Sequence, residues 1–527
     1  MNITIATLAF SGTLLASLLL TPVARRIAWK YDFVDRPDGL RKVHTRPVPV
    51  GGGVVLLLSL LATLATLYFA DPQNAADILV DYGRTTGVLL ASAVAIVAVG
   101  VWDDKLGMRG RTKLLVQVLI AVLLIGSGWG FSAISLGSWS IDLGVLSQLF
   151  ALVWILGSIN AFNLIDGSDG LAATVGTVIA ISVGTVALWQ GQSVGGILAF
   201  ALAGALVGFL PFNFAPASIY LGDGGSMLIG LMLGSIALGS CVKEAASISC
   251  APLFVIWLIP ILDSVAAFMR RVLTGRSIYS TDRGHIHHLL LTRGLGPRGV
   301  ALLVGGLCAT TSGAALASVY TGYEWIGPLV GMIVIGLLLV TGWFGRAEAS
   351  LVRTRLVNAG RKLVPSKKSS QQVAPTVVNL EQESSVVKLQ GDGRWEQIWR
   401  TLLESTQRLG VVQIRLNLFI PNIHESFYAN WQSSDLFESE HVWRIERPFF
   451  HDGTPIGRVA ATGIASHMNT STGASEFLEV TNSLSVEIMS LLEDLAAAPN
   501  RSVPGKAREG ARLMSGNLDP LQVAAPK

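Results

Sequence analysis

The sequence predicts an all-α polytopic membrane domain of about eleven transmembrane helices, followed by a small cytoplasmic α+β domain. Two observations carry this prediction. Hydrophobic residues make up 51% of the 527 residues and charged residues only 14%, and the apolar runs fill residues 1–345. From Arg346 onward the chain becomes polar. The net charge of +4 is small for this length, so composition gives no support for nucleic-acid binding.

The apolar runs are expected to be helices, because none shows the period-two alternation of a membrane barrel. The first run covers Met1–Leu20 and has no basic residue before its apolar core. It is therefore interpreted as a membrane helix rather than a signal peptide. The other runs, each about 20 residues long, centre near residues 60, 92, 121, 153, 181, 202, 232, 260, 310 and 334.

Basic residues gather in alternate loops, within residues 24–49, 105–113, 270–298 and 346–368. The positive-inside rule assigns these loops to the cytoplasm. With an odd number of helices, the N-terminus then lies outside and the C-terminal domain inside. Four polar clusters, described below, all fall on the predicted cytoplasmic face.

The predicted domain organisation has four parts. A membrane domain covers residues 1–345, a basic and polar linker 346–384, an α+β domain 385–497, and a disordered tail 498–527. No nucleophile, metal or nucleotide motif is recognisable in the α+β domain, so a regulatory role or a protein partner is expected for it. Its expected elements are a helix at 394–409, strands at 411–420, 423–431, 440–450 and 455–463, and a closing helix at 476–495.

The first polar cluster is NAFNLIDGSDGL, residues 160–171. It places the carboxylates Asp166 and Asp169 and the amides Asn160 and Asn163 at the mouth of an apolar run. Polar groups at such a place are costly, which suggests a site. Their oxygens are the hard ligands that Mg²⁺ prefers. The alternative is a turn rich in Asx and Gly between two helices.

Two further clusters are also rich in carboxylates. Asp103 and Asp104 end an apolar run, where they can bind a divalent cation or supply a base; a solvated helix end is the alternative. Asp223 stands in LGDGGS, where it can face a phosphate or a metal, or simply cap a helix.

The fourth cluster is basic. Arg283, His285, His287 and His288 suit a polyanionic ligand such as a diphosphate. A zinc site is disfavoured because cysteine partners are lacking and the other clusters carry oxygen ligands. Asp263 lies within the preceding apolar run, as a functional candidate or as part of a buried pair with an arginine.

Jointly, these clusters indicate phosphoryl transfer to or from a lipid-embedded substrate. The chain resembles the polyprenyl-phosphate N-acetylhexosamine-1-phosphate transferases of glycosyltransferase family 4. The HIHH form is similar to the undecaprenyl-phosphate GlcNAc-1-phosphate transferase branch. Five motifs carry the resemblance, which covers residues 1–345: RKVHTRPVPVGGG at 41–53, DDKLGMRGRTK at 103–113, NAFNLIDGSDGLA at 160–172, LGDGGSM at 221–227, and PILDSVAAFMRR with DRGHIHHLL at 260–290.

The resemblance implies that a UDP-sugar, with UDP-GlcNAc expected, gives its sugar-1-phosphate to undecaprenyl phosphate and releases UMP. This would be the first membrane step of cell-envelope polysaccharide assembly, at the bacterial inner membrane. A homodimer is a further expectation. The implied roles are Mg²⁺ binding, with Mn²⁺ able to substitute, by Asn163 and Asp223; catalysis by Asp103, Asp104, Asp166 and Asp169; and substrate binding by Lys113, Asn160, Asp263, Arg283, His285, His287 and His288.

Several alternatives stay open on the sequence. The same chemistry fits another UDP-N-acetylhexosamine or UDP-MurNAc-pentapeptide. A transporter would show inverted repeats and charges at mid-membrane depth, and an inactive scaffold would show damaged motifs, whereas these are intact. Direct attack by the lipid phosphate, with Asp103 or Asp104 as base, competes with a covalent aspartyl intermediate.

Overall fold

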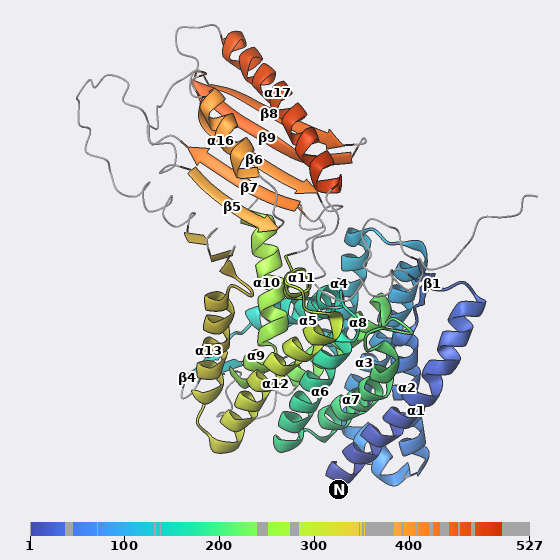
Figure 1. The fold of residues 1–527 in the computed structure, drawn as a ribbon. Helices are drawn as coiled ribbons and strands as arrows, with labels where there is room; N and C mark the ends of the chain where they lie inside the picture. The colour runs from blue at the N-terminus through green and yellow to red at the C-terminus, as the bar shows by residue number, and fades with distance from the viewer. Residues whose placement is uncertain are drawn as a thin grey trace, which may run out of the picture.

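The computed structural model shows a helical bundle and a separate sheet domain (Figure 1). It describes the following residues: 2–36, 46–70, 72–130, 133–136, 139–239, 251–273, 284–346, 348–349, 352–353, 384–390, 395–406, 409, 411–420, 425–432, 442–451, 454–464 and 470–497.

Every predicted apolar run contains a helix. In the described part of the chain, nine helices are long and apolar enough to cross a membrane. The chain is therefore a multi-pass membrane protein. The nine are α1 (Asn2–Lys30), α2 (Gly52–Ala70), α3 (Pro72–Leu106), α4 (Gly110–Ser127), α5 (Leu146–Ile165), α6 (Leu171–Trp189), α7 (Ser193–Asn213), α8 (Gly222–Gly239) and α12 (Pro297–Thr321).

The two remaining runs form shorter helices than expected. The run near residue 334 is α13 (Ile326–Thr341). The run near residue 260 is split into α9 (Ala251–Ile256) and α10 (Leu258–Leu273). Pro260 explains the break, because it has no N–H to offer the carbonyl of Ile256 and fits best in the first turn of a new helix.

Helices α6, α7 and α8 form the centre of the bundle, and α1 packs along α7 (Figure 1). A Cβ atom on Gly204 would lie 2.1 Å from the carbonyl oxygen of Phe10, and one on Gly208 would lie 2.5 Å from that of Leu14. Glycine is therefore required where α7 meets α1, because the two backbones touch there.

A second glycine contact joins the N-terminal ends of α2 and α8 to the C-terminal end of α3. A Cβ atom on Gly53 would lie 2.3 Å from the backbone nitrogen of Gly225, and one on Gly100 would lie 2.2 Å from that of Gly224. The three helices thus meet backbone to backbone beside Asp223. These contacts fix where the LGDGGS motif sits.

Two short strands bring the chain after α1 to the same place. Strands β1 (Val34–Asp35) and β2 (Val48–Pro49) pair antiparallel. Tyr220 N donates to the Pro49 carbonyl at 2.8 Å, and Gly52 N donates to the Tyr220 carbonyl at 3.0 Å. The segment around β1 therefore lies against the loop before α8. A hairpin of β3 (Ala133–Leu136) and β4 (Trp139–Asp142) joins α4 to α5.

A short helix, α11 (Ile286–Thr292), follows α10 and carries two of the predicted histidines. After α13, the side chain of Glu348 forms an ion pair with the buried Arg270 of α10. A Cβ atom on Gly284 would lie 2.5 Å from the same guanidinium group. The chain thus leaves the bundle at the end where the histidine segment lies.

The C-terminal domain is an antiparallel sheet of order β5-β7-β6-β9-β8 with two helices on one face (Figure 1). On β6, Ile414, Leu416 and Leu418 are buried whereas Arg415 is exposed, which is the alternation that predicted this strand. The elements are β5 (Ser384–Gln390), α16 (Trp395–Thr406), β6 (Val411–Ile420), β7 (Glu425–Gln432), β8 (Val442–His451), β9 (Thr454–Ile464) and α17 (Thr470–Ala497).

Strand β5 was not predicted, because it begins where the polar linker was expected to end. Trp395 and Trp399 of α16 and Phe477 of α17 belong to the core of this domain, which shares no residue with the core of the bundle. The expected tail, residues 498–527, lies outside the described residues.

Candidate active site

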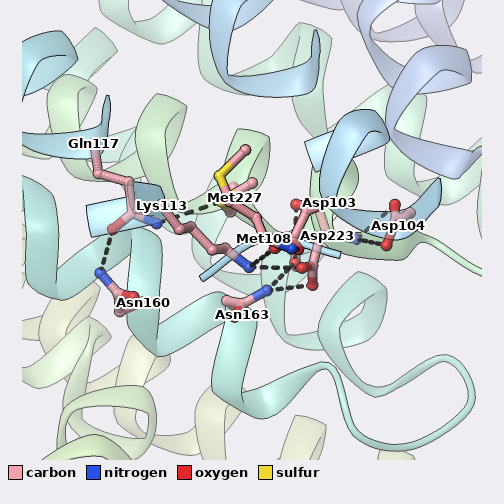
Figure 2. Close-up of polar contacts among 10 residues, drawn as sticks. Asp103, Asp104, Met108, Lys113, Gln117, Asn160, Asn163, Asp223 and Met227 are labelled. Carbon is pink, nitrogen blue, oxygen red and sulfur yellow. Dashed lines mark hydrogen bonds and ion pairs between the residues drawn. The ribbon is translucent and has the colours of Figure 1, made fainter. Parts of the chain in front are cut away.

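Asp223 is the meeting point of three of the four predicted clusters (Figure 2). It stands in the first turn of α8. Its Oδ2 atom accepts from Nζ of Lys113 on α4 at 2.6 Å, and its Oδ1 atom accepts from Nδ2 of Asn163 on α5 at 2.7 Å. The Asp223 carboxylate thereby binds Asn163, which is 60 positions away in the sequence, and Lys113, which is 110 positions away.

Asp103, at the end of α3, holds the other side of Lys113. Its Oδ2 atom lies 3.0 Å from Nζ of Lys113, and its Oδ1 atom accepts from the backbone N–H of Met108 at 2.7 Å. The side chains of Lys113 and Asp103 are only 14% and 13% exposed. One buried ammonium group therefore links two carboxylates.

Asp104 points in another direction than Asp103. Both of its carboxylate oxygens lie 3.1 Å from the backbone nitrogen of Asp223. Asp104 thus caps the start of α8, where the helix dipole favours negative charge. Successive helical residues are turned by about 100°, which explains why adjacent aspartates have different partners.

A second set of contacts lies about one helical turn away from Asp223 along α4, α5 and α8 (Figure 2). Asn160 Nδ2 donates to Oε1 of Gln117 at 2.9 Å, and Gln117 Nε2 lies 3.4 Å from Sδ of Met227. Beside Asp223, the Asn163 amide also reaches Oγ of Ser226 at 3.2 Å. Asn160 therefore contacts protein groups on the inner side of the site.

A cavity of about 580 Å³ opens beside this cluster. Four of the predicted aspartates line it, together with His288 and two aromatic residues, Phe33 and Tyr220. Asp103, Lys113, Asn160 and Asn163 are not among its lining residues. The lining is Asp32, Phe33, Val34, Asp35, Val50, Asp104, Lys105, Asp166, Gly167, Ser168, Asp169, Asn213, Tyr220, Leu221, Gly222, Asp223, His288, Leu291 and Pro297.

Asp166 is the carboxylate of this cavity that no described residue satisfies. Loss of hydration raises its pKa well above the usual range, and the charges of Asp223, Asp104 and Asp169 add to this rise. Asp169, in contrast, accepts from the backbone N–H of Ala217 at 2.9 Å. The cavity thus concentrates negative charge that a cation would offset.

The histidine segment is anchored by Asp263, which is 2% exposed on α10. Its Oδ2 atom lies 2.9 Å from Nδ1 of His285, and its Oδ1 atom accepts from Ile286 N at 2.8 Å. Both oxygens are therefore used inside the protein. Among the described residues, Asp263 pairs with a histidine rather than with an arginine, and it does not line the cavity.

His287 lies buried behind the cavity. A Cβ atom on Gly167 would lie 2.2 Å from its Nε2 atom, so the imidazole packs directly on the turn that carries Asp166. Burial, with the neighbouring His288 as the next cause, lowers the pKa of His287 to about 3. His288 is the member of the segment that lines the cavity. Arg283 lies outside the described residues.

The donor set suits a hard divalent cation. Asp223, Asp104 and Asp166 place carboxylate oxygens on the cavity, and the last has no described partner. Within the described residues, no three Asp, Glu, His or Cys side chains form a complete metal site. Mg²⁺ commonly uses one or two carboxylates plus substrate phosphates, which fits this arrangement.

Sequence reasoning missed the part of the cavity wall formed by Phe33, Asp35 and Tyr220. It also missed Gln117, which contacts Asn160 outside the cavity lining. Phe33 and Asp35 lie eight and six positions before the first residue of the RKVHTRPVPVGGG motif at 41–53, so their place near a family motif was a usable signal. Gln117 follows Lys113 by four positions in an otherwise apolar run, which puts both on one helix face.

Comparison with known proteins agrees with this geometry. The profile of the family described as Glycosyl transferase family 4 matches residues 86–240, which hold Asp103, Asp104, Asn163 and Asp223. A Bacillus subtilis protein named "Probable undecaprenyl-phosphate N-acetylglucosaminyl 1-phosphate transferase" is 31% identical over 299 residues, which are 56% of this chain and 80% of the relative. The chain belongs to glycosyl transferase family 4.

Other members of the family resemble it to a similar degree. The decaprenyl-phosphate N-acetylglucosaminephosphotransferase of Mycobacterium tuberculosis (strain ATCC 25618 / H37Rv) is 32% identical over 56% of this chain and 78% of its own. The undecaprenyl-phosphate alpha-N-acetylglucosaminyl 1-phosphate transferase of Escherichia coli (strain K12) is 28% identical over 63% of this chain and 89% of its own.

Proposed function

We propose that this family 4 member transfers GlcNAc-1-phosphate from UDP-GlcNAc to a polyprenyl phosphate, expected to be undecaprenyl phosphate, and releases UMP. The observation that carries the proposal is the aspartate-lined cavity beside the Lys113–Asp223 ion pair. Relatives in the same family carry names for transfer to undecaprenyl and decaprenyl phosphate. The cavity volume of about 580 Å³ is in the range of small-molecule sites.

In the proposed reaction, an oxygen of the lipid phosphate attacks the sugar-bearing phosphorus of UDP-GlcNAc. The bond between that phosphorus and the bridging oxygen breaks, and the bridging oxygen leaves with UMP. Asp104 is the member of the aspartate pair that lines the cavity, so we assign to it the role of accepting the proton of a lipid phosphate monoanion. Asp103 holds Lys113 in place.

Bound Mg²⁺ would neutralise part of the phosphate charge during the transfer. Asp223 and Asp166 are the residues that we propose to hold it, because both line the cavity. Asn163, predicted as a ligand, orients Asp223 through its amide nitrogen. Mn²⁺ has the same preference for oxygen ligands and is the proposed substitute.

The histidine segment would bind the diphosphate and the sugar. His288 lines the cavity and is the residue placed to donate to a phosphate oxygen. His285 is fixed by Asp263 and supports the start of α11. Lys113 would balance the carboxylates so that two anionic phosphates can approach.

We further propose that the site faces the cytoplasm of a bacterial cell at the inner membrane. Lys105 and Lys113, which belong to one of the basic loops, line the cavity and pair with Asp223 respectively, and the positive-inside rule assigns this loop to the cytoplasm. The contact of Glu348 with Arg270 supports an exit of the C-terminal domain on the same side. For that domain we propose a regulatory or protein-binding role.

UMP release by the full-length protein in detergent, with undecaprenyl phosphate, UDP-GlcNAc and Mg²⁺, tests the proposal. Asp223→Asn should abolish release, whereas Glu404→Gln, at an exposed position of α16, should leave it unchanged. Release with another UDP-sugar alone would keep the chemistry and change the donor. No release with any UDP-sugar from a folded protein would overturn the proposal.

A further inference from the structure

We infer that Gln117 and Asn160 are positioning residues, whose amide pair sets the rotation of α4 and α5 so that Lys113 and Asn163 reach Asp223. This inference deepens the proposed function and rests on it for its kinetic part. Asn160, expected to bind substrate, does not line the cavity. Its side-chain nitrogen is used by Gln117 Oε1 at 2.9 Å and by the Leu156 carbonyl at 2.8 Å.

The geometry consists of two layers, one helical turn apart. In the outer layer, Lys113 of α4 and Asn163 of α5 both bind Asp223 of α8. In the inner layer, the same three helices supply Gln117, Asn160 and Met227. The spacings of four, three and four positions place each inner residue below an outer one on the same helix face. Figure 2 shows both layers.

The Gln117–Asn160 hydrogen bond matters for α4 because apolar packing alone fixes the rotation of this helix only weakly. Its buried residues are Gln117, Ile120, Ala121 and Leu124, and Gln117 is the polar one among them. Its opposite face exposes leucines and a valine of similar character: Leu114, Leu115, Leu119, Val122 and Leu123. In a bilayer, lipid tails are as apolar as leucine, so turning α4 would exchange one apolar contact for another.

A polar side chain removes this freedom. Gln117 is 1% exposed, so solvent has little access to replace a lost partner. Rotation of α4 would therefore leave the side-chain oxygen of Gln117 without its partner, whereas Asn160 would keep its bond to the Leu156 carbonyl of its own helix. Because Lys113 lies one turn away on the same face, keeping Gln117 on Asn160 keeps the ammonium group on Asp223.

Two variants separate this role from simple stability. Gln117→Leu removes the amide at similar volume, and Gln117→Asn keeps an amide that is too short to reach Asn160. The double swap Gln117→Asn with Asn160→Gln restores the pair, because the two side chains together keep the same length. Trp154→Phe is the control, since it removes another α5–α8 hydrogen bond, from Trp154 Nε1 to the Gly234 carbonyl at 3.0 Å, away from the site.

The first readout does not depend on activity. Amine acylation of the full-length protein, followed by mass spectrometry of the peptides, reports how well the ion pairs protect Lys113, with the exposed Lys105 as internal reference. Both single variants should raise Lys113 labelling severalfold relative to Lys105. The double swap should restore protection, and Trp154→Phe should not change it.

The second readout is kinetic. Because displacement of a catalytic group by about 1 Å can cost about 100-fold in rate, we expect kcat of both single variants to fall at least about tenfold while KM for UDP-GlcNAc changes little. Unchanged Lys113 protection in Gln117→Leu and Gln117→Asn would overturn the inference. Should the wild type release no UMP, the proposed function fails, and the labelling experiment still decides the positioning role.

Discussion

Nζ of Lys113 lies 2.6 Å from Oδ2 of Asp223, although the two residues are separated by 110 positions. The same nitrogen lies 3.0 Å from Oδ2 of Asp103. One ammonium group therefore offsets part of the charge of two carboxylates beside a cavity that is itself rich in aspartate. The proposed substrates bring further negative charge, so this balance is the electrostatic basis of the site.

Lys113→Met should lower kcat by at least about 100-fold, the loss that removal of one preorganised charged or hydrogen-bonding group commonly causes. Without the ammonium group, Asp103 and Asp223 would repel each other and the approaching phosphates. Lys113→Arg keeps the charge and should recover part of the rate. Steady-state kinetics of UMP release measure both, and a methionine variant with wild-type kcat would contradict the electrostatic role.

Gly167→Ala should damage the site, because its Cβ atom would lie 2.2 Å from Nε2 of the buried His287. Either the imidazole or the turn that carries Asp166 must then move, at a cost of about 1–3 kcal/mol. We expect a lower Tm and a strongly reduced kcat. The matched control is Gly157→Ala on α5, where the added Cβ atom would meet no atom within 4 Å; equal behaviour of the two variants would refute the packing argument.

His287 should make the fold sensitive to acid. Its pKa falls from 6.5 to about 3 on folding, because burial disfavours the imidazolium form. The neutral His287 side chain therefore makes its full contribution to the free energy of unfolding above pH 6.5. This contribution is lost as the pH falls from 6.5 toward 3. Between about pH 7 and pH 5 the loss is about 2 kcal/mol, from about 1.4 kcal/mol per pH unit.

Thermal unfolding of wild type and His287→Asn at both pH values checks this expectation. Asparagine does not titrate in this range, so the difference in Tm between about pH 7 and pH 5 should shrink in the variant. An identical pH dependence in both proteins would show that other groups control acid unfolding.

Trp399→Ala should destabilise the C-terminal domain without slowing the transferase reaction. Trp399 is 2% exposed in the core of the sheet domain, and such truncations cost about 3–5 kcal/mol. The core of the bundle shares no residue with this core. We expect a lower unfolding temperature for the domain and an unchanged kcat, with Glu404→Ala as the exposed control on α16; a fall in kcat would indicate that the domain supports the active site.

The helices of the bundle could be predicted because lipid leaves the backbone few choices. An apolar run of spanning length must satisfy its own hydrogen bonds, and every such run contains a helix. Strand β6 was predicted with its observed bounds, because its alternation follows the pleat. The break between α9 and α10 at Trp257 was not predicted, because the position of Pro260 does not fix the residue at which the next helix begins.

The sequence indicated which polar clusters come together in the structure, but not the direction of their side chains. Asp103 and Asp104 were given one role, but helical rotation sends the first to Lys113 and the second to the cavity. Asp263 was expected to bind substrate, but its partner is the buried His285. Such assignments depend on which helix faces which neighbour, and that is a tertiary property.

The glycine contacts beside Asp223 bear on how the protein can move. Gly53 and Gly100 meet Gly225 and Gly224 with no side chain between them, so α2, α3 and α8 have no flexible layer along which they could slide. These contacts therefore favour a fixed spacing between the aspartates at the ends of α3 and α8. We therefore expect any opening for the proposed substrates at the other wall of the cavity, where Phe33 precedes β1 and His288 lies on the short helix α11.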